Sequence, residues 1–326
     1  MNQSASLAEP CCSPPPSIAA PRFLTGGVWH DMTWAPGRRR PVRVMYRMEG
    51  PAGAPVVATF GGISASRRVD EWWHDHYGAD QALDPERHRI LSIDWLSERW
   101  PDGSPVTTAQ QATALVAVMD ELGIGRLEAC IGASYGAMVG LALAADFPGR
   151  IGQLIAISGA HCPHPMAAAR RLIQREIIGL GLAAGDERRG LRLARALAMT
   201  TYRPASLFAE RFGHDDPRRM LGRLDSYFDR QARGLIGRFD AERYLSLSES
   251  LDLHRVDPAA VTCPVTLVAV QSDELVPVEQ LQTLDRVLPD SSLRVIASDY
   301  GHDAFLKESV FFDKLIREAL AQGVVQ

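Results

Sequence analysis

Short apolar runs alternate with longer segments of helical spacing over most of the chain. The apolar runs have the length and the flanking residues of buried strands, and the segments between them gather their apolar residues on one helix face. This alternation predicts an α/β fold with a mostly parallel central sheet covered on both faces. The predicted strands are 42–48, 55–60, 89–93, 127–131, 151–158, 265–270 and 293–297, and the predicted core helices are 107–122, 137–147 and 311–321.

The alternation stops in the stretch that follows the fifth predicted strand. Helical periodicity is found there at 166–182, 187–199 and 216–236, and no run is typical of a buried strand. A large insertion beside a core site commonly forms a lid or an oligomer contact. We therefore predict three parts: a flexible N-terminal tail at 1–20, an α/β core at 21–162 and 256–326, and a helical lid insertion at 163–255.

Composition and charge narrow the classes of function. The chain has 326 residues, of which 46% are hydrophobic and 23% charged, which is enough for a sizeable core. The net charge of -4 gives no reason to expect a nucleic-acid or anionic-membrane partner. No apolar run reaches about 18 residues, and the N-terminal segment lacks the pattern of a secretory signal. We therefore expect a cytoplasmic protein without a membrane span.

The cysteines and histidines give no sign of a metal or disulfide framework. The five cysteines are odd in number and irregular in spacing. The run His161-Cys162-Pro163-His164 has ligand-type residues but no distant partners at ligand spacing, so no metal is predicted. No glycine-rich nucleotide-phosphate loop occurs either. An aromatic patch that includes Trp72 and Trp73 is interpreted either as part of a substrate entrance or as core packing.

The sequence Gly132-Ala133-Ser134-Tyr135-Gly136 has the G-x-S-x-G pattern of a nucleophile elbow. It lies between a predicted strand and a predicted helix, which is the context that this motif requires. The sharp turn exposes the serine at the helix N-terminus, where backbone N–H groups favour negative charge. The pattern predicts Ser134 as a nucleophile. The alternative is a structural turn in which Ser134 only caps the helix.

A serine nucleophile needs a base that is oriented by a third group. In α/β folds that carry a nucleophile elbow, the chain order of the triad is Ser, then Asp or Glu, then His, and each residue follows a strand. Asp273 follows the strand at 265–270, and His302 follows the last strand. We predict Ser134, Asp273 and His302 as the catalytic triad. The alternatives are that Asp273 caps a turn, that Asp299 or Asp303 orients His302, or that His302 is a surface histidine.

An oxyanion hole requires two backbone N–H donors. The N–H of Tyr135, directly after the nucleophile, is one predicted donor. The second is expected in the glycine loop that follows an early strand, at Phe60 or Gly61, since glycine lets the backbone approach a ligand closely.

From about residue 55 to residue 320 the chain resembles the homoserine O-acyltransferases of the α/β-hydrolase superfamily. General hydrolases do not share the tyrosine-leucine-aspartate stretch, which makes the resemblance fairly specific. The matching segments are Thr201-Tyr202-Arg203, Phe239-Asp240, Tyr244-Leu245, Leu251-Asp252-Leu253, Ser272-Asp273 and Gly301-His302-Asp303-Ala304-Phe305.

The resemblance implies a ping-pong acyl transfer in methionine biosynthesis. Ser134 would take an acyl group from acyl-CoA, which is a co-substrate and not a cofactor, and the hydroxyl of L-homoserine would then accept it. By analogy, Arg203 binds the carboxylate of the amino acid and Asp303 its ammonium group, and a guanidinium fork suits a carboxylate. The resemblance also implies a homodimer in which the insertion forms the contact.

The acyl group is predicted from charge. Succinyl carries a carboxylate that needs a cation in its pocket, whereas acetyl is neutral. In succinyl-using relatives an arginine occupies a place similar to that of Arg171, which favours succinyl-CoA; the alternative is that Arg170, Arg171 and Arg175 form a solvated helix face. Homoserine O-succinyltransferase is therefore the predicted activity.

Other activities stay open at this point. They are transfer from acetyl-CoA, transfer to serine, and plain ester hydrolysis. Serine is retained as an acceptor because the elbow and the glycine loop differ from common members of the family. A catalytically dead binding protein is disfavoured, since all three triad residues are present.

Overall fold

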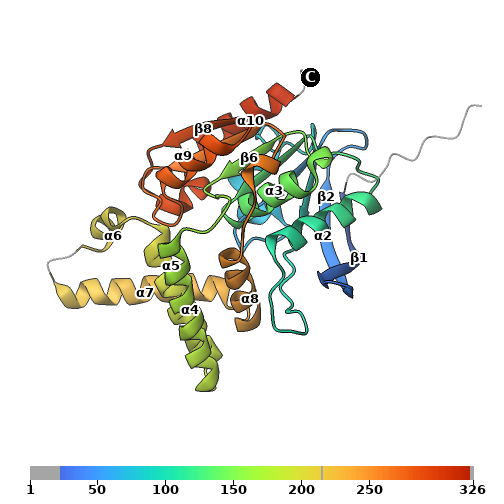
Figure 1. The fold of residues 1–326 in the computed structure, drawn as a ribbon. Coiled ribbons are helices and arrows are strands. Elements are labelled where there is room, and N and C mark those ends of the chain that lie inside the picture. Colours follow the sequence, from blue (N-terminus) through green and yellow to red (C-terminus); the bar gives the residue numbers. More distant parts are fainter. Residues whose placement is uncertain (1–22, 214–215, 324–326) are drawn as a thin grey trace, which may run out of the picture.

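Eight strands form one sheet in the computed structural model, which describes residues 23–213 and 216–323 (Figure 1). The strand order is β1-β2-β4-β3-β5-β6-β7-β8, with β1 and β2 antiparallel and β3 to β8 parallel to one another. The bounds are β1 Phe23–Ala35, β2 Arg38–Glu49, β3 Val56–Phe60, β4 Arg89–Ile93, β5 Ala129–Ala133, β6 Leu154–Ile157, β7 Val265–Val270 and β8 Ser291–Ile296.

The central strands are apolar on both sides because helices cover both faces of the sheet. Neighbouring residues Val57 and Ala58 of β3 belong to two different core clusters, as the alternation of side chains along a strand requires. The helices α2 (Thr108–Glu121), α3 (Tyr135–Asp146) and α9 (Val278–Val287) pack on one face, and α1 (Val69–Trp72) and α10 (Ser309–Gly323) on the other.

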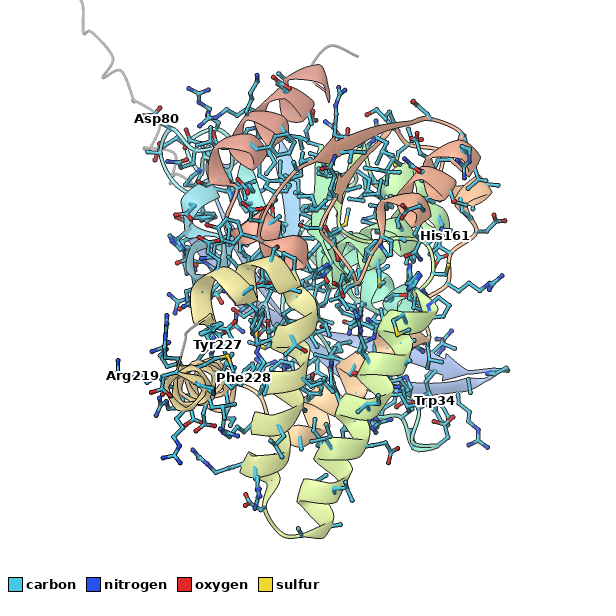
Figure 2. All side chains as sticks on the ribbon, turned by 90° about the vertical axis from the view of Figure 1, so that its left-hand side faces the viewer. Trp34, Asp80, His161, Arg219, Tyr227 and Phe228 are labelled. Atoms are coloured by element: carbon cyan, nitrogen blue, oxygen red, sulfur yellow. The ribbon has the colours of Figure 1, made fainter. Side chains whose placement is uncertain are left out.

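Five helices stand between β6 and β7, within the stretch predicted as the insertion, and gather on one side of the sheet (Figure 1). They have a small core of their own, in which Tyr227 is 1% exposed and packs against Phe212 and Phe228 (Figure 2). The helices are α4 Pro165–Ala183, α5 Glu187–Tyr202, α6 Ala205–Phe212, α7 Pro217–Leu235 and α8 Ala241–Asp252.

Two neighbouring helices of the insertion, α4 and α5, pack backbone against backbone. A Cβ atom on Gly181 of α4 would lie 2.7 Å from the Cα atom of Gly190 on α5, so this close approach depends on glycine. This close packing brings side chains at the core-facing ends of both helices, such as Arg171 of α4 and Arg195 of α5, to the same cavity.

The prediction of an α/β fold with a mostly parallel sheet is confirmed, and the predicted strands at 89–93 and 265–270 coincide with β4 and β7. The predicted tail at 1–20 lies outside the described residues. The sequence pattern missed β1, α1, α6, α8 and α9. The described helices include none that combines the length and apolar character needed to cross a membrane.

Candidate active site

Ser134 forms the turn between β5 and α3. Its φ of 56° and ψ of -116° lie in a region that residues other than glycine rarely adopt. Its N–H donates to the carbonyl of Ile157 on β6 at 2.8 Å, which ties the turn to the neighbouring strand. The side chain makes no capping bond to α3, so the alternative of a purely capping serine is wrong.

The two glycines of the motif are required by close packing. A Cβ atom on Gly132 would lie 2.3 Å from the carbonyl oxygen of Gly136, and one on Gly136 would lie 2.5 Å from that of Phe60. Both separations are shorter than atoms tolerate, so larger residues would displace the turn. The motif therefore keeps β3, β5 and α3 close enough to hold Ser134 at the sheet edge.

Ser134, His302 and Asp273 form a continuous hydrogen-bonded chain. The Oγ atom of Ser134 lies 2.8 Å from Nε2 of His302, whose Nδ1 lies 2.7 Å from Oδ2 of Asp273. The other oxygen of Asp273 accepts the N–H groups of Leu275 at 2.8 Å and Val276 at 3.1 Å. The predicted trio is thus brought together, and Asp273, rather than Asp299 or Asp303, orients the histidine.

The environment of His302 favours its protonated form. Burial lowers the pKa of His302, but the negative charge of Asp273 and the hydrogen bond to it raise the pKa, and the net shift is upward. A histidine in this position can take a proton from Ser134 and remain stabilised as an imidazolium by the buried carboxylate.

The loop that carries His302 is fixed from two sides. Gly301 has a φ of 56°, and a Cβ atom there would lie 2.7 Å from the carbonyl oxygen of Tyr202, at the end of α5. On the core side, the indole N–H of Trp73 donates to the carbonyl of Phe305 at 2.8 Å. Of the aromatic patch, Trp73 is thus core, whereas Trp72 lines the cavity at Ser134.

Gly62 is the residue of the glycine loop that lies beside the nucleophile. A Cβ atom on Gly62 would be 4.0 Å from Oγ of Ser134. Phe60 is still paired with Gly132 in the sheet, and the carbonyl of Gly61 accepts the N–H of Gly136 at 3.0 Å. The predicted donor positions Phe60 and Gly61 directly precede Gly62 in the chain, and strand pairing continues through Phe60. Tyr135 begins α3, so its N–H has no partner within the helix.

A cavity between the core and the insertion opens onto Ser134. The core contributes Ser134, Gly62 and Met138, and the insertion contributes Arg171 and Gln174. The hydroxyl of Tyr244 donates to Oε1 of Gln174 at 2.7 Å, which leaves the amide NH₂ of Gln174 as the group available to the cavity. Gln174 was not among the predicted site residues, since nothing in the sequence marks a glutamine on an amphipathic helix as functional.

Arg203 and Asp303, predicted to bind the amino acid, form an ion pair with each other. Nε of Arg203 lies 3.1 Å from Oδ2 of Asp303, and both side chains are 13% exposed. Asp303 lines the cavity directly after His302, and Arg203 lies behind it at the end of α5. The structure therefore brings a cation and an anion together beside the base.

Arg171 lies in a cluster in which two arginines share one carboxylate. Nε of Arg171 lies 2.7 Å from Oδ1 of Asp252, and Nη1 of Arg175 lies 2.6 Å from Oδ2. Arg171 and Asp252 are each 13% exposed, so a solvated helix face does not describe them. The cluster has one positive charge in excess, and Arg171 is its member that lines the cavity.

His164 caps α4, since its Nδ1 accepts the N–H of Met166 at 3.3 Å. Within the residues that the structure describes, no three His, Cys, Asp or Glu side chains are close enough to hold a metal ion.

Comparison with known proteins finds a match to the family model of the alpha/beta hydrolase fold at residues 56–182. The homoserine O-succinyltransferase of Xanthomonas campestris pv. campestris is 42% identical over 315 residues, which cover 92% of this chain and 85% of that protein. The homoserine O-acetyltransferase of Chlorobaculum tepidum is 29% identical, with 87% of this chain and 90% of that protein covered.

Among solved structures, the fold is similar to homoserine O-acetyltransferase from Bacillus anthracis, with a TM-score of 0.82, 17% identity, and 92% of this chain and 98% of that one covered. The crystal structure of esterase E22 is also similar, with a TM-score of 0.78, 20% identity, and 91% of this chain and 100% of that one covered. At these identities the likeness concerns the fold.

Proposed function

Because the chain belongs to the homoserine O-acyltransferase family of the α/β-hydrolase fold, we propose that it transfers a succinyl group from succinyl-CoA to the hydroxyl of L-homoserine. One observation carries the proposal. The hydrogen-bonded serine opens onto a cavity lined by Asp303, which pairs with Arg203 behind it, and by Arg171, which belongs to an arginine cluster with a positive charge in excess. Such a cavity offers separate partners for a zwitterionic acceptor and an anionic acyl group.

Acylation begins when Oγ of Ser134 attacks the carbonyl carbon of the thioester. His302 takes the hydroxyl proton through Nε2, and Asp273 stabilises the resulting imidazolium. The carbon–sulfur bond then breaks, His302 returns the proton to the departing CoA thiolate, and the acyl group remains as an ester of Ser134.

Transfer repeats the same proton movements with a different nucleophile. His302 takes the proton from the hydroxyl of homoserine, whose oxygen attacks the ester carbonyl. The bond to Oγ breaks, and His302 returns the proton to Ser134. In both halves the N–H of Tyr135 donates to the tetrahedral oxyanion, and the N–H of Gly62 replaces Phe60 and Gly61 as our proposed second donor.

The Arg203–Asp303 pair fits the acceptor. An amino acid is a zwitterion, so its ammonium group can be bound by Asp303 while its carboxylate is bound by Arg203, with charge conserved as the internal pair opens. Asp303 follows His302 in the chain, which places the bound amine close to the base that activates the hydroxyl.

The arginine cluster fits the donor. A succinyl group holds a free carboxylate at the end of its chain, and that carboxylate is costly to desolvate without a cation. Asp252 neutralises one of the two guanidinium groups of Arg171 and Arg175, so one charge remains for the acyl carboxylate. No cofactor is included in the proposal, and the cytoplasm remains the predicted compartment.

A homodimer is also part of the proposal. Helix α4 has several large apolar side chains on its surface, among them Leu180, which is 72% exposed, and Ile173, which is 53% exposed. Met166, Ile173 and Leu180 are spaced by seven residues and so lie along one side of the helix. An exposed apolar stripe of this kind supports an isologous contact between two insertions.

The test is CoA release from succinyl-CoA and from acetyl-CoA, each with homoserine, with serine and without an acceptor. The proposal predicts fast release only with succinyl-CoA and homoserine, with O-succinylhomoserine as the product. Fast release from acetyl-CoA would assign acetyl transfer, and release that needs serine would reassign the acceptor. Release without any acceptor would indicate a hydrolase.

A further inference from the structure

Arg195 is a cation of the catalytic cavity that the proposed reaction has not used. It lies on α5 and lines the cavity that opens onto Ser134. Its Nε atom is buried and has no hydrogen-bond acceptor. Within 23–213 and 216–323, no carboxylate forms an ion pair with it. Removing a guanidinium donor from water without giving it an acceptor is unfavourable, so a half-buried arginine whose Nε lacks an acceptor is suited to an anionic ligand.

The other arginines of the cavity differ from Arg195 because each of them has a carboxylate or carbonyl partner. Arg170 pairs with Glu274 at 2.9 Å, and Arg171 shares Asp252 with Arg175. Arg238 donates through Nε and Nη2 to the carbonyl of Gly234. Each of these guanidinium groups has a partner within the protein, whereas Arg195 has the face of an aromatic ring.

That ring places Arg195 near the catalytic histidine. The guanidinium carbon of Arg195 lies 5.4 Å from the centroid of the Tyr202 ring, and the centroids of Tyr202 and His302 are 5.8 Å apart. One aromatic ring thus separates Arg195 from the base. A guanidinium that stacks on a ring keeps its in-plane N–H donors free for a carboxylate.

Arg195 and Arg171 also lie around the same side chain. Burial raises the pKa of Tyr244, and the positive charges of Arg195, Arg171 and Arg175 oppose this shift. Helices α4 and α5 lie side by side (Figure 1). Arg171 and Arg195 therefore line the cavity from two adjacent helices. Asp252 is the acidic partner in this group of three arginines, which leaves two positive charges in excess.

We propose that Arg195 binds the free carboxylate of a dicarboxylic acyl group carried on Ser134, with Arg171 as the second contact. The inference rests on the proposed acyl transfer and extends it, since it assigns a selectivity residue on α5 that the sequence did not identify. The carboxylate of a succinyl group stands two methylene groups beyond the ester carbonyl, which suits a cation separated from His302 by one ring.

Two other anions could in principle bind Arg195: the carboxylate of homoserine and the phosphates of CoA. Both fit less well than the acyl carboxylate. The carboxylate of homoserine already has Arg203, whose partner Asp303 is released to bind the amine. The phosphates of CoA are separated from the thioester by the whole pantetheine arm, whereas Arg195 is close to the reacting histidine. The carboxylate of the acyl group is the remaining anion of the two substrates, and it lies close to the reacting ester as Arg195 does.

The experiment compares donors in the wild type and in Arg195→Met. Succinyl-CoA is compared with butyryl-CoA, which has the same chain length and no carboxylate, and formation of the acyl-enzyme is followed in a single turnover. We expect kcat/KM for succinyl-CoA to fall about 10- to 100-fold, and that for butyryl-CoA to change less than about 3-fold. Arg195→Lys should recover part of the succinyl reaction because it restores the charge without the planar fork.

Arg188→Met is the matched control, since it makes the same change at an exposed position of α5 and should leave both donors unaffected. Butyryl transfer by Arg195→Met reports on its folding. An equal loss with both donors, or a loss confined to the KM for homoserine, would overturn the role of Arg195 while leaving succinyl transfer intact. A wild type that forms no succinyl-enzyme would instead refute the proposed function itself.

Discussion

The core and the insertion contribute to one cavity in different ways. The core supplies Ser134, His302 and Asp273, whose polar atoms are all engaged in a hydrogen-bonded chain anchored to strand ends. The insertion supplies arginines on helices, and their charges are only partly neutralised: it has 17 arginines and 12 acidic residues between 163 and 255, in a chain whose net charge is -4. In the proposed function, the triad of the core carries out acyl transfer, and the arginines of the insertion select the substrates together with Asp303 of the core.

The comparison with known structures agrees with this division. The fold is shared with esterases as well as with acyltransferases, and a serine triad alone does not distinguish them. If the division is correct, substitutions in the triad should reduce transfer from every donor. Substitutions of the insertion's arginines, or of the core residue Asp303 that pairs with Arg203, should instead change the use of one donor or of the acceptor.

The largest effect is expected from Ser134→Ala. Without Oγ no acyl-enzyme can form, so CoA release should fall by roughly 10⁴-fold or more for succinyl-CoA and acetyl-CoA alike. The measurement is CoA release at saturating homoserine, with circular dichroism as the control for folding. Substantial residual transfer by this variant would contradict a covalent mechanism.

A smaller and more selective loss is expected from Asp303→Asn. The variant loses the charge that binds the ammonium group and leaves Arg203 without its partner, so kcat/KM for homoserine should fall about 10- to 100-fold. Formation of the succinyl-enzyme should remain within about 3-fold of the wild type in a single-turnover assay. Equal losses in both half-reactions would place Asp303 in the triad machinery rather than at the acceptor.

Arg171→Leu should produce a still smaller change that is confined to the donor. The remaining Arg175–Asp252 pair has no net charge, but Arg195 still lines the cavity, so kcat/KM for succinyl-CoA should fall about 10-fold with little effect on acetyl-CoA. The two donors are measured side by side at saturating homoserine. A parallel loss with both donors would make Arg171 a structural residue.

The smallest effect is a displacement of the pH profile. Burial lowers the pKa of His302, but the charge of Asp273, its hydrogen bond and the charge of Asp303 together raise it further, and only the neutral imidazole can accept the proton of Ser134. Activity should therefore rise as the pH increases through the raised pKa, so the acidic limb of kcat/KM for succinyl-CoA should have its midpoint above the ordinary histidine value of about 6.5. A midpoint at or below that value would show that burial dominates.

The sequence predicted the core better than the insertion for physical reasons. Apolar strands and the glycines of the elbow follow from local constraints, so Ser134 and the strands around it were predictable. Strand β1 was missed because it is an edge strand that contains Gly26 and Gly27 and buries few of its residues, so its apolar pattern is weak. The position of Gly62 was missed because it depends on where strand pairing ends.

In the insertion, helical periodicity indicated helices but not their partners. Pairing of Arg203 with Asp303, and of Arg171 with Asp252, joins residues 100 and 81 positions apart. The sequence has many arginines and does not show that Arg195 lacks a carboxylate partner, because this depends on which carboxylates the fold brings close to it.

The most direct test of the account is to mix the wild-type protein with succinyl-CoA alone and record its intact mass. The account predicts one succinyl group per chain, located on Ser134 by peptide mapping. On addition of L-homoserine that group should disappear, with equimolar formation of O-succinylhomoserine. Absence of the adduct under conditions in which CoA is released, or an adduct that homoserine does not discharge, would contradict succinyl transfer through Ser134.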